Sequence, residues 1–151
     1  MSTSEHFVLA DEWLLNAPTA RVYAVLADPS RYPTWWPQVR SAVPLDADRG
    51  HATVRALLPY TMHLTVTRES VDPDAGLLRA RLSGDLDGWC SWRVTPSASG
   101  FTRARFDQQV RVTPWVMRLW ARWARDLALA NHRAMMRGGE RGLEAYLAGR
   151  R

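Results

Sequence analysis

A long amphipathic segment near the end of the chain most constrains what this sequence can fold into. Between residues 114 and 136 one stripe repeats at the i, i+3, i+4, i+7 spacing of a helix face, and it is rich in tryptophan. The stripe consists of Val116, Trp120, Trp123, Leu127, Asn131 and Ala134, and the opposite face carries Arg118, Arg122, Arg125 and Arg133. Because no other segment predicts a long helix, this stripe must be buried against a β-sheet.

The chain before this helix is a series of strand-like segments separated by turn residues. Alternation and turn chemistry predict strands at residues 6–15, 39–43, 52–58, 62–71, 77–83, 89–94 and 101–112. A short helix is expected from Pro18 to Asp28, followed by a second short turn over residues 30–32. These elements predict an α+β fold in a single domain, residues 1–151, in which a curved, mostly antiparallel seven-stranded sheet wraps around the long helix.

Alternation within the strands predicts which side chains face the helix. The inward sets are Met62, Leu64 and Val66, then Leu78, Ala80 and Leu82, then Ala104, Phe106, Gln108, Val110 and Val112. Bulky indoles over a concave sheet leave room for a cavity. We therefore expect the function to reside in a pocket rather than in a contiguous sequence motif.

Composition excludes several kinds of chemistry and partner. All 20 basic residues are arginine, so Schiff-base catalysis by a lysine side chain is excluded. Cys90 is the only cysteine, which rules out an intramolecular disulfide. The net charge of +5 is spread among acids such as Glu69 and Asp107, whereas a nucleic-acid binder usually shows a denser basic cluster. We expect no nucleic-acid partner.

Hydropathy predicts a soluble chain. The longest apolar runs, such as residues 127–130, fall far short of the roughly 20 residues that a membrane-spanning helix needs. Residues 1–6 lack the apolar region of a signal peptide. These features predict a cytoplasmic protein with no stable membrane insertion.

Several short blocks together resemble a known family over nearly the whole chain. The blocks are Ala17-Pro18, Val22-Tyr23, Leu26, Asp28-Pro29, Tyr32-Pro33, Trp35-Trp36-Pro37, Gly84-Asp85-Leu86, Gly88, Trp92, Asn131-His132, Met135-Met136 and Gly142-Leu143. They resemble the helix-grip fold of the START-like superfamily, also called SRPBCC, in its polyketide cyclase/dehydrase and lipid-transport branch. The resemblance implies a deep cavity that holds lipids, sterols or polyketides, and it carries over no catalytic residues.

Two pairs of tryptophans are candidate contacts to such a ligand. Trp35 and Trp36 stand in a rigid corner between Pro33 and Pro37, which fits either a gate over the pocket or a structural corner packed on the sheet. Trp120 and Trp123 on the helix stripe fit either a hydrophobic core or a ligand contact.

Polar residues at inward positions are the next candidates. Asn131 on the buried helix stripe needs a partner, since an unpaired buried amide costs roughly 1–3 kcal/mol. Gln108 can supply that partner in a core pair, or both amides can orient a carbonyl or hydroxyl group of an apolar ligand. His132 is turned roughly 100° from Asn131 by helix geometry and is either structural or a general base.

Arg68 follows the inward side of its strand, where a buried guanidinium needs a carboxylate such as Asp85 or an anionic ligand; the alternative is a strand-end arginine that reaches water. His63 falls on the opposite side of the same strand. The histidines are dispersed along the sequence, so we expect no metal site and no cofactor.

The glycines at 138, 139 and 142 predict a kink or end of the long helix before residues 143–147.

The leading hypothesis is a protein that binds a hydrophobic or aromatic small molecule between the sheet and the long helix. Its expected contacts are Trp35, Trp36, Met62, Leu64, Leu82, Trp92, Phe106, Gln108, Trp120, Trp123, Leu127 and Asn131. The rival is a cyclase or aromatase in which Arg68, Asp85 or His132 moves protons. A third hypothesis is a lipid carrier that docks on anionic membranes through the arginine face of the helix.

Overall fold

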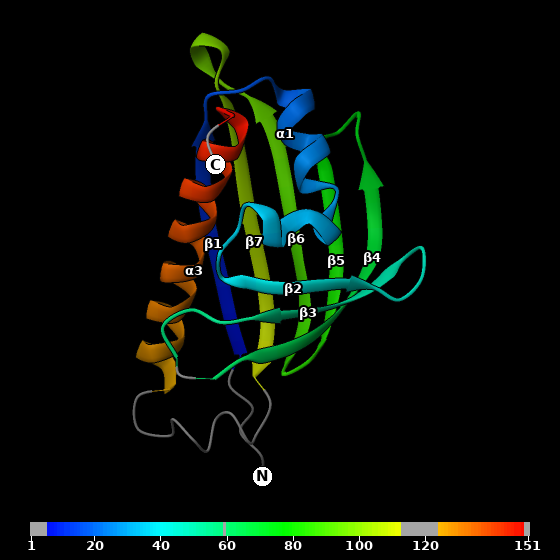
Figure 1. Ribbon diagram of the computed structural model, residues 1–151, viewed down its shortest axis with the longest axis vertical. Coiled ribbons are helices and arrows are strands. Elements are labelled where there is room, and N and C mark those ends of the chain that lie inside the picture. Colours follow the sequence, from blue (N-terminus) through cyan, green and yellow to red (C-terminus); the bar gives the residue numbers. More distant parts are fainter. Residues whose placement is uncertain (1–5, 59, 113–123, 150–151) are drawn as a thin grey trace.

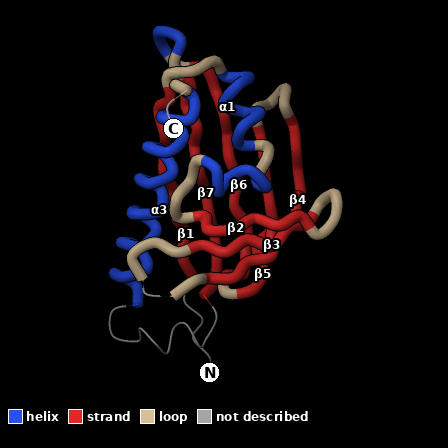
Figure 2. Tube along the Cα trace, in the orientation of Figure 1, coloured by secondary structure: helices blue, strands red, loops and turns tan. Residues whose placement is uncertain are grey.

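One curved antiparallel sheet and one long helix make up most of the molecule, and short helices close one end (Figure 1). The computed structural model describes residues 6–58, 60–112 and 124–149. Figure 2 shows the strands bending around a concave face, with the long helix beside the first strand. This is the helix-grip arrangement expected from the sequence.

The elements follow the chain in the predicted order. They are β1 (His6–Leu15), α1 (Thr19–Leu26), η1 (Pro29–Thr34), β2 (Val39–Pro44), β3 (Arg49–Val54), β4 (Met62–Asp72), β5 (Leu77–Gly84), β6 (Leu86–Pro96), η2 (Ala98–Gly100), β7 (Thr102–Val112) and α3 (Ala124–Leu147). The strands lie side by side in the order β1-β7-β6-β5-β4-β3-β2, and all neighbours are antiparallel. The first strand therefore pairs with the last.

Side-chain alternation along β7 was predicted correctly. Phe106, Val110 and Val112 are buried, whereas Arg103 and Arg105 are exposed on the outer face. Two-residue periodicity places every second side chain on the concave face, where apolar area leaves water. The same alternation carries across the sheet because the strands pair with few register shifts.

The connection between β3 and β4 departs from the prediction. The sequence pattern predicts a strand over residues 52–58, but β3 ends at Val54. Beyond it, the backbone N–H groups of Leu57 and Leu58 donate to Oδ1 of Asn131 at 2.8 and 3.0 Å instead of joining a neighbouring strand. The backbone of this segment therefore binds to the helix rather than to a strand, with Leu58 buried and Leu57 exposed.

The prediction that glycines break the long helix is wrong. Helix α3 runs without interruption to Leu147. A Cβ atom at Gly139 would lie 2.5 Å from the indole of Trp36 and 2.7 Å from that of Trp13, and one at Gly142 would fall on the carbonyl oxygen of Trp35. The glycines thus let the helix backbone approach the tryptophans closely, and this packing outweighs their low helix propensity.

A group of tryptophans, here called the aromatic cluster, joins this end of α3 to the sheet. Its members are Trp13 from β1, Trp35 and Trp36 from the corner after η1, and Trp92 from β6. Trp13 is 1% exposed, and its ring centroid lies 4.7 Å from that of Trp92. Such edge and tilted contacts add about 0.5–1.5 kcal/mol per pair beyond area burial.

Two hydrogen bonds complete the attachment of α3. The indole Nε1 of Trp36 donates to the carbonyl oxygen of Met135 at 2.9 Å, and Nη1 of Arg21 on α1 donates to the carbonyl oxygen of Leu147 at 2.7 Å. The second bond satisfies an acceptor in the last turn of the helix, where carbonyl groups lack partners within the helix. These two bonds fix the position of the C-terminal half of α3. Because the helix is continuous, its N-terminal half, which begins at Ala124, is positioned as well.

Candidate functional site

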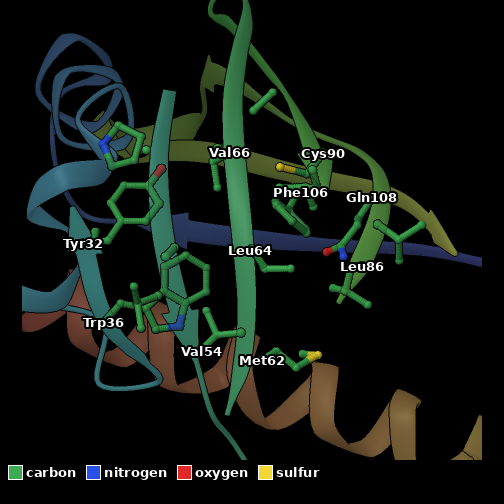
Figure 3. Close-up of a pocket in the computed structure, with 18 of the residues that line it drawn as sticks. Tyr32, Trp36, Val54, Met62, Leu64, Val66, Leu86, Cys90, Phe106 and Gln108 are labelled. Carbon is green, nitrogen blue, oxygen red and sulfur yellow. The ribbon is translucent and has the colours of Figure 1, made fainter. Parts of the chain in front are cut away.

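A cavity of about 420 Å³ lies between the concave face of the sheet and α3. Side chains from β1, η1, all the other strands and α3 contribute to its wall. Its volume falls in the range of small-molecule sites, roughly 300–1,000 Å³. Figure 3 shows aliphatic and aromatic side chains from several strands converging on this space.

Most of the predicted contact residues lie in the cavity wall. These are Trp36, Met62, Leu64, Leu82, Trp92, Phe106, Gln108, Leu127 and Asn131. Their role in binding a ligand stays a prediction. The predicted contacts Trp120 and Trp123 lie outside the described residues, as does the predicted start of the helix.

Trp35 and Trp36 do not form an exposed gate. Each is 4% exposed, and the two rings stack with centroids 5.3 Å apart. Trp36 lines the cavity, whereas Trp35 belongs to the core and does not reach the cavity wall. Both indoles are buried because the corner places them between the sheet and the glycine-lined side of α3.

The proposed amide pair of Asn131 and Gln108 does not form. Asn131 is 7% exposed, and its Oδ1 accepts from the backbone of Leu57 and Leu58. Its partner is thus the loop after β3, and we call this contact the Asn131 latch. The sequence identified Asn131 as a residue that needs a partner, but backbone groups in an irregular loop carry no side-chain signature.

Gln108 is left without a partner. It is 9% exposed, lies on the inward face of β7 and lines the cavity. No hydrogen bond joins its side-chain amide to another described residue. Figure 3 shows this amide in the space that apolar side chains such as Phe106 and Leu64 also enter.

His132 also reaches the cavity wall, although helix geometry predicted that it would turn away from it. Its ring is stacked against Phe106 with centroids 6.0 Å apart, and its Nε2 is enclosed without a hydrogen-bond partner in the described part of the chain. Burial disfavours the charged imidazolium and lowers the pKa of His132, so the ring is neutral at pH 7. A neutral imidazole is competent as a base.

Cys90 is a cavity residue that the sequence analysis did not select. It lies two residues before Trp92 on the same face of β6 and opposite Gln108 on β7. Burial disfavours the thiolate and raises the pKa of Cys90 to about 12. Alternation along this strand puts Cys90 on the same face as Trp92 and would have found it.

The proposed pairing of Arg68 with Asp85 is wrong. Asp85 follows β5, where its Oδ2 accepts from the backbone N–H of His63 at 2.8 Å, and it does not line the cavity. Arg68 pairs with Ala80 further along the β4–β5 ladder and is exposed at the cavity wall. Its guanidinium makes no ion pair within the described residues. The arginine therefore follows the alternative prediction, in which it reaches water.

The charged side chains of the cavity wall gather in a few segments, which we call the charged rim. They are Asp28, Asp46, Asp48, Arg49, Arg68 and Arg79. Two of these arginines are neutralised, because Arg49 pairs with Asp46 at 2.8 Å and Arg79 pairs with Glu69 at 3.2 Å. The wall formed by β1, β6, β7 and α3 contributes no charged side chain among the described lining residues.

Two of the dispersed histidines meet on the paired strands β3 and β4. Nδ1 of His63 lies 3.4 Å from Nε2 of His51 on the neighbouring strand. Among the described residues, no three metal-ligating side chains come together. Within the same residues, no helix is both long and apolar enough to span a membrane.

The chain and its fold have counterparts among known proteins. A family model described as "Polyketide cyclase / dehydrase and lipid transport" matches residues 8–148. A comparison with curated proteins found no match.

Among solved structures, the chain is similar to the Zhui aromatase/cyclase of a Streptomyces strain, with a TM-score of 0.78, 14% identity, and coverage of 95% of this chain and 94% of that chain. A protein from Thermus thermophilus gives a TM-score of 0.75 at 19% identity, with coverage of 93% and 99%. A START superfamily protein from Mycobacterium smegmatis gives 0.71 at 14% identity, with coverage of 96% and 99%. At these identities the likeness establishes the fold.

Proposed function

Because the chain belongs to the polyketide cyclase/dehydrase and lipid transport family, we propose that it binds a hydrophobic or aromatic small molecule, such as a lipid or a polyketide-like compound. The observation that carries the proposal is the 420 Å³ cavity between the sheet and α3, whose wall is mostly apolar. A cavity of this size and lining is the usual form of a small-molecule site.

Burial of the ligand provides the binding free energy. A ligand that loses on the order of 300 Å² of apolar surface gains several kcal/mol at about 25 cal/mol/Å². Ordering of the ligand and loss of its free motion offset part of this gain. We therefore expect micromolar affinity. Aromatic rings of Trp36, Trp92 and Phe106 in the wall favour ligands with flat ring systems.

Native mass spectrometry of the purified protein tests the proposal first, because a co-purified ligand appears as added mass. Tryptophan quenching with fatty acids, sterols and aromatic polyketides then measures affinity. Ala80 lines the cavity, whereas Ala10 is exposed on the outer face of β1. Ala80→Phe should fill the cavity and abolish binding, and the matched Ala10→Phe should leave binding unchanged. An empty protein that no panel member quenches would refute the proposal.

The second candidate function is a cyclase or aromatase activity on a ligand in the same cavity. It is favoured by the neutral His132 at the cavity wall, which is a competent base, and by Arg68 at the charged rim. Turnover of a polyketide-like substrate that is lost in His132→Ala or Arg68→Ala, while ligand affinity is retained, would support this activity. Equal loss of binding and turnover would assign the residues to binding alone.

A further inference from the structure

Gln108 presents an unused hydrogen-bonding group to the cavity. Its amide holds one carbonyl acceptor and two N–H donors, yet no hydrogen bond joins it to another described residue. Buried polar groups in folded proteins nearly always have a partner, and leaving one unmade costs free energy. Because Gln108 lines the cavity, a molecule inside the cavity can supply the missing partner.

The described cavity-lining residues around Gln108 are uncharged. Its neighbours across the ladders are Leu9 on β1 and Cys90 on β6. The buried thiol of Cys90 stays protonated and the imidazole of His132 stays neutral at pH 7. The oxygen of Asn131 is already occupied by the Asn131 latch. An ionised group at this depth would find no counter-ion among the described lining residues, and burying an unpaired charge is strongly unfavourable.

Charge is confined to the other part of the wall. The charged rim comes from the residues around the β2–β3 turn, from the start of η1 and from β4 and β5. Gln108, by contrast, lies on β7, between β1 and β6. The cavity therefore offers two chemically distinct regions: an interior whose described polar side chains are neutral, and a rim with acids and arginines.

We propose that Gln108 is the specificity-determining residue of this cavity, and that it hydrogen-bonds an uncharged carbonyl or hydroxyl group on an otherwise apolar ligand. Ligands that would place an ionised group at this depth are excluded. The inference rests on the proposed function, because it requires that the cavity bind a small molecule. It adds the chemical class of the ligand and the residue that selects it.

Three rigid ligands of nearly the same shape test the proposal: fluorenone carries a carbonyl group, fluorene carries none, and fluorene carboxylate is ionised. Equilibrium dialysis at neutral pH measures the affinity of each. The wild-type protein should bind fluorenone roughly threefold to tenfold more tightly than fluorene, which is the range for one net hydrogen bond. It should bind the carboxylate at least about tenfold more weakly than fluorene.

Substitution of Gln108 should remove this preference. In Gln108→Leu and in Gln108→Met, which keeps the side-chain length, fluorenone should lose its advantage while fluorene binds equally or more tightly. Gln109 is the matched control, because it follows Gln108 on β7, faces the outer side and does not line the cavity. Gln109→Leu should keep the wild-type order of affinities. Circular dichroism and a thermal melt establish that each variant is folded.

The outcomes separate this inference from the function on which it rests. If all three ligands bind the wild type with equal affinity, or if the preference for fluorenone survives in both Gln108 variants, the specificity assignment is refuted and the binding function stands. If the carboxylate binds most tightly, the exclusion of ionised groups is refuted. If neither these ligands nor the wider panel binds at all, the proposed function fails and the inference fails with it.

Discussion

The close approach of α3 to the aromatic cluster predicts opposite effects for the same substitution at two glycines in one helix. At Gly142 an added Cβ atom would fall on the carbonyl oxygen of Trp35 and lie 2.9 Å from its carbonyl carbon. Those atoms are backbone, so no side-chain rotation relieves the overlap. At Gly138 the nearest atoms belong to the amide end of the Gln38 side chain, which can rotate away.

The effects of the two substitutions on stability can be compared directly, because the gain in helix propensity is the same at both sites. Replacing glycine by alanine inside a helix gains about 1 kcal/mol. Overpacking typically costs about 1–3 kcal/mol, and a clash with backbone belongs at the upper end. Gly142→Ala should therefore be destabilised by about 2 kcal/mol, and Gly138→Ala should be neutral or stabilised by up to about 1 kcal/mol.

Urea unfolding followed by tryptophan fluorescence measures this difference, since the tryptophans of the aromatic cluster report on the packing. The midpoint should fall for Gly142→Ala and not for Gly138→Ala, with unchanged slope in both. In a thermal melt, a difference of about 2–3 kcal/mol corresponds to roughly 4–12 °C for a domain of this size. Equal stability of the two variants would refute the reasoning, because the helix would then not need the missing Cβ atom at Gly142.

Two further predictions concern the Asn131 latch and Cys90. Asn131→Leu removes the acceptor for the backbone N–H groups of Leu57 and Leu58 and should cost about 2–4 kcal/mol in a thermal melt, whereas Asn131→Asp retains an acceptor and should cost less; equal losses would contradict the latch. Because burial raises the pKa of Cys90 to about 12, the rate of its alkylation by iodoacetamide should rise about tenfold per pH unit from about pH 7 to 10. A plateau near pH 9, the ordinary range for a thiol, would show that Cys90 is not buried in this way.

Periodic features could be predicted from the sequence because they depend on local geometry. The bounds of β1 agree with the alternation of Phe7, Leu9 and Trp13, and the inward face of β7 follows from the same two-residue period. Neither prediction required knowledge of a distant segment. The curved seven-stranded sheet and the position of the long helix against it followed from the resemblance together with the need to bury an amphipathic stripe, whereas the order of the strands was not predicted.

Features that depend on contacts between distant residues could not be predicted in this way. Glycine at 139 and 142 usually signals the end of a helix, and only the position of Trp35 and Trp36 across the interface explains why the helix continues. The partner of Asn131 is a backbone segment 73 and 74 residues away, with no recognisable pattern of its own. The inward reach of His132 likewise depends on how α3 rotates against Phe106.

The strand order also fixes when the molecule can be completed. His6 at the start of β1 pairs with Arg111 near the end of β7, so the first strand has no partner until almost the whole sheet has been synthesised. Pairings this distant in the chain slow folding, because loop closure must precede the contacts that stabilise it. During translation the hairpins from β2 to β6 can form while the backbone groups of β1 still lack a partner strand. The nascent chain therefore acquires its cavity only after β7 and α3 have left the ribosome.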